Sequence, residues 1–406
     1  MPVTNENMIK YIPEEISFSI LSKLPRKSLK RFQCVRKSWS LLFENQYFVN
    51  MFRNNFLSYS DPASFILRTV ENRKEVFYSF SGERFENKVK LDWANSLNKN
   101  NFWTHILGFG SINGTFCVHG SIIPCKIVLW EPATQTMKFL PPGEAESLKS
   151  SFPYEVEANV HVFVNWYLHG FGYDNVINDY KVIRYVDVYA EDSLGEYVED
   201  LEEIISLGGI DTNIGHLWEI YSLRSNSWRK LHVDMPYSSV CRDGTQVYVD
   251  GVCHWLCESY STVGIESCLV SFYLNNETFF ITPLPSDVDY CSDVNAPWVN
   301  LAALNGFVAL ISYHEETTSF HISILSEFGT KDKWTKLLIV GPLSCVEHPI
   351  GVGAKGEIVF IRKDEELVWL DLSTQMIGEL GYKGADRWDR IVIYKESILP
   401  IEGISN

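Results

Sequence analysis

The sequence predicts an α+β protein, in which a small N-terminal head of three helices precedes an all-β domain built as an irregular six-bladed propeller. Three observations predict this architecture. Apolar residues recur at helical spacing up to residue 55, and short apolar runs bounded by turn residues follow from residue 56 onward. Hairpin-like stretches then return at a nearly constant interval. A large β-sandwich is the alternative, because irregular repeats do not by themselves require closure into a ring.

The first predicted helix covers residues 13–24. Pro13 suits a first helical position, and Glu14 and Glu15 favour the positive end of the helix. Pro25 ends the segment. The apolar residues of this helix are predicted to form one stripe: Ile16, Ile20 and Leu24, with Leu21 beside them.

A second helix is predicted to begin at Ser28, whose hydroxyl can cap it. Its apolar residues follow at steps of three or four: Leu29, Phe32, Val35, Trp39 and Leu42. Its other face is basic and carries Lys30, Arg31, Arg36 and Lys37. A third short helix is predicted over residues 45–55. A head of this size buries little apolar surface by itself, so it needs a partner within the chain or outside it. A structural cap on the main body is the plainer interpretation.

The body contains two recurring kinds of hairpin. The first kind turns on Asn-Gly, Asp-Gly or Lys-Gly, as in "INGTFCVH", "VDGVCHWLC", "LNGFVALISY" and "AKGEIVFIRK". The second kind joins an apolar strand to a returning strand with a bulky residue, as in "EIYSLRSNSWRKL" and "LVWLDLSTQMIGEL". Its anchors are separated by 51, 51 and 47 residues: Leu223, Leu274, Leu325 and Leu372.

A period of roughly 45–50 residues with strand pairs is typical of propeller blades, and Kelch repeats are the nearest class. Counting such units predicts about six blades. We expect "RIVIYKESI" near the C-terminus to pair with "SFILRTVENRKEVFYSF" near residue 70 and complete one blade. Ring closure of this kind removes exposed sheet edges.

Composition indicates a globular protein, since 46% of the 406 residues are apolar and 21% are charged. The net charge of −16 divides unevenly, with +5 on residues 1–55 and −21 on the rest. Nine scattered cysteines and the absence of an apolar leader in "MPVTNENMIK" predict reduced thiols and a cytoplasmic or nuclear location. No run of 18 apolar residues occurs, so no membrane partner is expected.

Catalytic and metal chemistry find little support in the motifs. On a strand, Cys253 and Cys257 would stand about 13 Å apart and His254 would face the other way, which disfavours a zinc site. No phosphate-binding or nucleophile-elbow motif occurs. The acidic body also disfavours nucleic acid. A propeller hydrolase whose catalytic groups converge from distant loops stays open.

The head resembles the F-box, which docks on the Skp-type adaptor of a Skp–cullin–F-box ubiquitin ligase. The match runs over "IPEEISFSILSKLPRKSLKRFQCVRKSWSLL" and includes Leu24-Pro25, Ser28-Leu29 and Lys37-Ser38-Trp39. The resemblance implies an F-box over residues 8–55. It also implies adaptor-binding roles for Ile12, Pro13, Ile16, Ile20, Leu24, Pro25, Leu29, Val35 and Trp39.

The body resembles the plant F-box-associated interaction domain, through "GFGYD", "DYKVI", "IYSLRSNSWRKL", "VDGVCHWL" and "SFYL". S-locus F-box proteins share this layout. The resemblance implies that residues 56–400 capture a client protein for ubiquitylation, with no catalytic residue, no metal and no cofactor in this chain. Its implied partners are the adaptor, a cullin through it, and a client that the sequence does not identify. The alternatives are an F-box protein that sequesters a partner outside a ligase, and the hydrolase.

Overall fold

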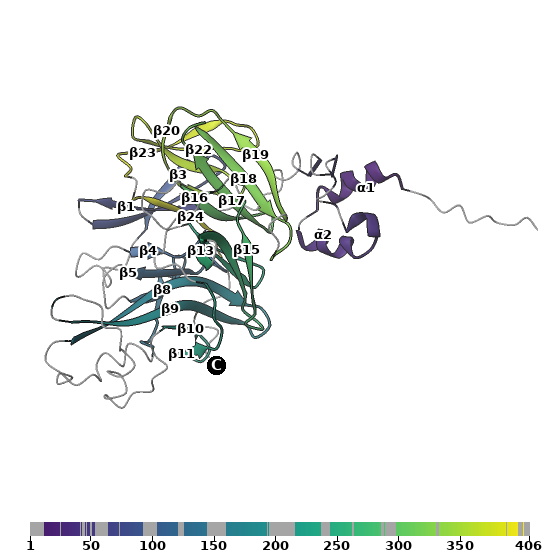
Figure 1. The fold of residues 1–406 in the computed structure, drawn as a ribbon. Coiled ribbons are helices and arrows are strands. Elements are labelled where there is room, and N and C mark those ends of the chain that lie inside the picture. Colours follow the sequence, from purple (N-terminus) through teal and green to yellow (C-terminus); the bar gives the residue numbers. More distant parts are fainter. Residues whose placement is uncertain are drawn as a thin grey trace, which may run out of the picture.

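A computed structural model of the chain shows six four-stranded antiparallel sheets arranged as the blades of a propeller, with a helical head beside them (Figure 1). The structure describes residues 12–52, 64–91, 104–120, 126–143, 160–194, 216–236, 244–285, 298–329, 333–396, Val288 and Ile401, apart from short gaps within these ranges. In each blade the order of strands runs from an inner strand outward.

The first three blades take their strands from the N-terminal half of the body, except for one strand. Blade 1 contains β24 (Arg390–Tyr394), β1 (Ser64–Glu71), β2 (Lys74–Ser81) and β3 (Asn87–Leu91). Blade 2 contains β4 (Thr104–Ile106), β5 (Phe116–Gly120), β6 (Ile127–Glu131) and β7 (Thr136–Phe139). Blade 3 contains β8 (Val160–Asp174), β9 (Asp179–Asp192), β10 (His216–Ser222) and β11 (Ser227–Leu231).

The other three blades follow the chain in order. Blade 4 contains β12 (Gln246–Val249), β13 (Val252–Ser261), β14 (Gly264–Tyr273) and β15 (Phe279–Pro283). Blade 5 contains β16 (Val299–Leu304), β17 (Phe307–His314), β18 (Ser319–Leu325) and β19 (Trp334–Val340). Blade 6 contains β20 (Val346–Val352), β21 (Ile358–Arg362), β22 (Glu366–Leu370) and β23 (Ile377–Lys383).

The inner hairpins of blades 2, 4 and 5 turn as the sequence predicts, whereas in blade 6 only Gly356 of the Lys355-Gly356 pair has a positive φ. Asn305 and Gly306, which join β16 to β17, both have positive φ values, 47° and 75°. Two consecutive residues with positive φ define the type I′ turn that suits the twist of a hairpin, and Asn-Gly adopts it at little cost. The same pair of positive φ values occurs at Asn113-Gly114 and at Asp250-Gly251. The first kind of hairpin therefore joins an inner strand to the second strand of its blade.

The ring closes through strands from opposite ends of the body. Strand β24 pairs antiparallel with β1, and Phe65 lies opposite Ile393 in the register. The predicted closure is confirmed, and the β-sandwich alternative is wrong, because the strands form six small sheets rather than two large ones.

The core of the propeller lies between the blades, because each strand sends alternate side chains to the two faces of its sheet. On β13, Trp255 packs with Ile183 and Ile220 of blade 3. The next residue, Leu256, packs with Leu301 and Val308 of blade 5. Apolar side chains on both faces explain why these strands read as nearly continuous apolar runs in the sequence.

The head contains α1 (Glu14–Leu21), α2 (Arg26–Gln33) and the 3-10 turn η1 (Lys37–Trp39). The predicted second helix was wrong at both ends, since it begins before Ser28 and stops at Gln33 instead of continuing to Leu42. Its end is marked by Val35, whose N–H donates to the Phe32 carbonyl at 2.9 Å, and by the extended backbone of Arg36. The third predicted helix falls partly outside the described residues, so three helices are not shown.

No helix within the described ranges is both long enough and apolar enough to cross a membrane.

Candidate functional site

Helix α1 presents one apolar face to the interior and another to solvent. Phe18 and Leu21 are buried, 3% and 2% exposed. Ile12, Ile16 and Ile20, spaced four residues apart, are 57%, 52% and 56% exposed. The predicted single stripe is therefore wrong about Leu21, which points away from Ile16 and Ile20. We call Ile12, Ile16 and Ile20 the isoleucine row.

The start of α1 sets the position of the isoleucine row. Pro13 lies at the N-cap, one position earlier than predicted, with φ −54° and ψ 145°. Its carbonyl accepts the backbone N–H of Ser17 at 3.1 Å and so completes the first turn. Glu14 and Glu15 occupy that turn, where their charge favours the positive end of the helix.

The segment after α2 adds further exposed apolar surface. Val35 is 69% exposed, and Phe32 is 38% exposed with its ring edge-on to Trp39 at 6.0 Å. Basic side chains lie exposed on the same small unit: Lys23, Arg31, Arg36 and Lys37. The head thus combines apolar contact groups with a positive charge, which suits an acidic protein surface that has an apolar centre.

Not every predicted contact residue is exposed. Leu29 is 1% exposed and belongs to the internal core of the head. Leu24 and Trp39 are partly buried against that core. Pro13 is exposed, and Pro25 lies outside the described residues. The structure therefore brings Ile12, Pro13, Ile16, Ile20 and Val35 to the surface and places the other described residues behind it.

Aromatic residues for which the sequence predicts no functional role hold the head together. The Phe18 ring meets Phe48 edge-on at 5.6 Å, and Phe48 stacks on Phe52 at 5.8 Å. The Phe52 ring in turn meets the Phe307 ring of blade 5 edge-on, with the ring centroids 5.5 Å apart. The three-residue spacing of Phe18 and Leu21 could have indicated that they share the buried face of the helix. The isoleucines form a second face that is equally apolar, so the sequence alone does not distinguish the buried face from the exposed one. The head and blade 5 share one continuous core, which fixes the head on the propeller (Figure 1).

Buried charged side chains in the propeller form ion pairs and hydrogen bonds that hold its strands and blades together. Arg184 pairs with Glu219 at 2.6 Å, and its guanidinium lies 3.9 Å from the centre of the Trp228 ring. Lys181 pairs with Asp174 at 2.8 Å and donates at 2.8 Å to the Leu274 carbonyl of blade 4. These groups tie strands and blades together and leave their charges compensated, as burial requires.

The cysteine pair that suggests zinc lies in an unsuitable setting. Cys253 and Cys257 pack in one apolar cluster, while His254 leaves that face and its Nδ1 lies 2.9 Å from the Ser271 hydroxyl. Burial raises the pKa of the Cys253 thiol, and a protonated thiol is a poor metal ligand. Among the residues that the structure describes, no three His, Cys, Asp or Glu side chains gather as a metal site requires.

Comparison with known proteins places this geometry in context. Residues 111–394 match the family model of the F-box associated beta propeller domain. F-box protein CPR1 of Arabidopsis thaliana is 24% identical over 396 residues, which cover 92% of this chain and 84% of that protein. The F-box/kelch-repeat protein At3g23880 of the same plant is 22% identical over 366 residues, covering 86% of this chain and 85% of that protein.

Proposed function

This chain belongs to the F-box associated β-propeller family and is a plant F-box protein with that domain at its C-terminal side; we propose that it is the substrate-recognition subunit of a Skp–cullin–F-box ubiquitin ligase. The observation that supports the proposal most directly is the isoleucine row. A soluble surface helix normally turns such residues inward. Here the inward face is already occupied by Phe18 and Leu21, so the outward row is available to a separate protein.

The row and Val35 supply enough apolar surface for a docking contact. Each of these side chains contributes about 1.5–3 kcal/mol when it leaves water completely. The cost of association offsets much of this gain. The exposed basic residues, including Lys23 and Arg36, would raise the rate of encounter with an acidic adaptor more than the final affinity. The exposed residues would be held in position by the core residues beneath them, which include Leu24, Leu29 and Trp39.

The division of labour follows from the two parts of the chain. We assign adaptor docking to residues 8–55 and client capture to the propeller within residues 56–400. The contact between Phe52 and Phe307 would hold a bound client at a fixed distance from the adaptor and the cullin. The chain itself performs no chemistry in this assignment. It contributes proximity, which turns a bimolecular transfer into a nearly intramolecular one.

The proposal is tested by co-purification of the full-length chain with a Skp-type adaptor. We expect Ile16→Glu and Ile20→Glu to abolish capture, because each places a charge in the centre of the docking surface. The matched control is Val176→Glu, at a residue that is 71% exposed on the propeller, and it should be captured like the wild type. Equal capture of Ile16→Glu, Ile20→Glu and the control would overturn the adaptor-docking role.

A second readout separates a ligase subunit from a protein that only sequesters a partner. A ligase subunit captured with its adaptor and cullin should transfer ubiquitin to proteins bound at the propeller. Capture of the adaptor with stable, unmodified bound proteins would favour sequestration.

A further inference from the structure

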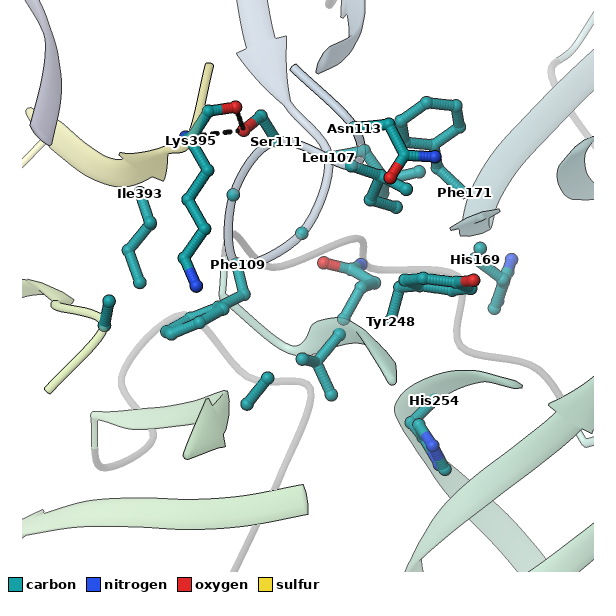
Figure 2. A pocket seen from close by; sticks show the side chains of 18 residues that line it. Leu107, Phe109, Ser111, Asn113, His169, Phe171, Tyr248, His254, Ile393 and Lys395 are labelled. Carbon is teal, nitrogen blue, oxygen red and sulfur yellow. Dashed lines mark hydrogen bonds between the residues drawn. The ribbon is translucent and has the colours of Figure 1, made fainter. Parts of the chain in front are cut away.

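The chain at the end of strand β24 lies between two cavities of the propeller. Ile393 and Lys395 line the first cavity, which has a volume of about 260 Å³ and gathers residues from all six blades (Figure 2). Tyr394 and Glu396 line the second cavity, which has a volume of about 460 Å³ and lies between blades 1 and 6. Alternate residues of an extended chain point to opposite sides, so this segment contributes to both cavities. Ligand pockets in proteins occupy about 300–1,000 Å³, so the second cavity, which we call the blade 1–6 cavity, has the size of a ligand site.

An aromatic pair lines the blade 1–6 cavity. Phe65 at the start of β1 and Phe85 in the turn after β2 are both buried, and their rings stack with the centroids 4.1 Å apart. Both rings belong to the core between blades 1 and 6, together with Val359 and Leu367. The face of an aromatic ring attracts a cation, and its carbon surface covers an apolar chain. This wall therefore suits a cation that is carried on an apolar stem.

A buried carboxylate lines the same cavity. Glu357, directly before β21, is 6% exposed, and its carboxylate accepts hydrogen bonds from backbone N–H groups, including that of Lys355 at 2.9 Å. These donors carry no net charge, and no side chain in the part of the chain that the structure describes forms an ion pair with Glu357. Burial raises the pKa of Glu357, and the exposed Lys355 ammonium offsets this effect only in part. A cation placed in the cavity would therefore stabilise this carboxylate.

Gly353 brings the carboxylate and the aromatic wall together. A Cβ at this position would overlap Oε2 of Glu357 and lie 2.9 Å from Cε1 of Phe65, so both groups lie against the glycine. The Gly353 N–H donates to the Glu357 carbonyl at 2.6 Å and closes the turn between β20 and β21. The Ser64 hydroxyl donates to the Tyr394 carbonyl at 3.2 Å and joins β1 to β24. The lining is therefore preformed, which lowers the cost of ordering on binding.

The exposed part of the lining adds further negative charge. Glu83 and Glu396 are exposed, and Lys355 is the one Lys or Arg among the lining residues that the structure describes. With Glu357, the described lining carries three carboxylates and one ammonium group. A surplus of negative charge around a cavity raises the local concentration of cations and favours their entry.

We propose that the blade 1–6 cavity binds an organic cation, which is an ammonium or guanidinium group on an apolar stem. Glu357 would pair with the cationic group, and Phe65 and Phe85 would cover the stem. Such a group could be the side chain of a lysine or arginine in a bound protein, or it could be a free amine. An inorganic cation fits less well, because no three His, Cys, Asp or Glu side chains of the described residues gather as a metal site requires.

The source of the cation decides how the cavity relates to the rest of the molecule. A basic side chain of a bound protein would make the cavity part of client capture, and this identification rests on the function proposed above. A free amine would not depend on that function. Adaptor docking is assigned to the isoleucine row and is measured by co-purification, so its failure and the failure of cation binding are distinguishable.

The test compares cations with neutral molecules of the same shape on the full-length chain at pH 7, by ligand-observed NMR titration. The first pair is the N-methylamide of Nα-acetyl-arginine and that of Nα-acetyl-citrulline. The second pair is 3-phenylpropylamine and 3-phenylpropan-1-ol. We expect at least one cation to bind about tenfold or more tightly than its neutral counterpart. Glu357→Gln should remove that preference, because it keeps an acceptor for the Lys355 N–H and removes the charge.

The matched control is Glu347→Gln, the same change at an exposed residue of β20 that does not line the cavity. It should bind the cations like the wild type. Binding of the arginine probe alone would assign the cavity to a basic side chain, and binding of the amine alone would assign it to a free amine; both outcomes support a cation site. Failure of all four probes to bind, or a preference for the cation that survives in Glu357→Gln, would overturn the inference.

Discussion

Glu357 is a carboxylate held almost out of reach of water, at 6% exposure beside the turn that joins β20 to β21. Its Oε2 accepts the backbone N–H of Lys355 at 2.9 Å, so the side chain closes the turn on itself. Burial raises its pKa above the usual 4.5, against the smaller opposing effect of these hydrogen bonds. The residue therefore stabilises the turn through geometry while its charge opposes folding.

This balance predicts a dependence of stability on pH. Because the pKa of Glu357 is higher in the folded state, the folded chain binds more protons, and stability falls as the pH rises from about 4.5 through the folded-state pKa. Glu357→Gln keeps an acceptor for the Lys355 N–H and removes the charge. We expect the variant to be more stable than the wild type in urea unfolding at pH 7, with the difference disappearing near pH 4.

Glu347→Gln, at an exposed position of β20, is the control for a change of net charge. It should follow the wild type at both pH values. A stability difference for Glu357→Gln that stays constant between pH 4 and pH 7 would show that the charge of Glu357 has no influence on folding.

At the scale of elements, the short segment between β4 and β5 connects two blades of the ring. It lies along β24, and Gly110 is the residue of closest approach. A Cβ at Gly110 would stand 2.5 Å from the Ile393 carbonyl oxygen, which is too close for any side chain. Only glycine allows the two backbones to form their parallel bridge, and this bridge joins blade 2 to the closing strand of blade 1.

Gly110→Ala should therefore force the two segments apart and lower the free energy of unfolding by about 1–3 kcal/mol. The matched control is Gly120→Ala at the end of β5, where an added Cβ would meet no atom within 4 Å. That variant should be neutral or slightly stabilised, because alanine reduces the freedom of the unfolded chain. Chemical denaturation of both variants measures the difference. Equal stabilities would mean that the segment moves away from β24 without cost.

The hairpins could be predicted from the sequence because their causes are local. Asn305-Gly306 determines a turn type by itself, and the apolar runs on each side of it determine the strands. The faces of α1 could not be predicted, since Ile16 and Phe18 are both apolar and the choice between them depends on Phe48, far along the chain. The cavity beside Ser111, Gln246 and Ile393 could not be predicted for the same reason, because its lining gathers residues from all six blades.

At the scale of the whole molecule, the fold depends on a contact between residues more than 300 positions apart. Strand β24 is the inner strand of blade 1, and Ile391 and Val392 are almost fully buried in it. Val392 packs with Ile66, Phe77 and Phe116, so it joins the core between blades 1 and 2. The ring therefore cannot be completed until the end of the body has been synthesised and has found β1.

One substitution at two positions of blade 1 tests how much the molecule depends on this closure. Val392→Asp places an unpaired charge at a side chain that is fully buried in the inner strand, and we expect a loss of more than about 4 kcal/mol or failure to fold. Val89→Asp makes the same change on the outer strand β3, where the side chain is 58% exposed. It should change stability by no more than about 0.5 kcal/mol. Circular dichroism during urea unfolding measures both. A cooperative, wild-type transition in Val392→Asp would mean that five blades and an open first blade are stable without the closing strand.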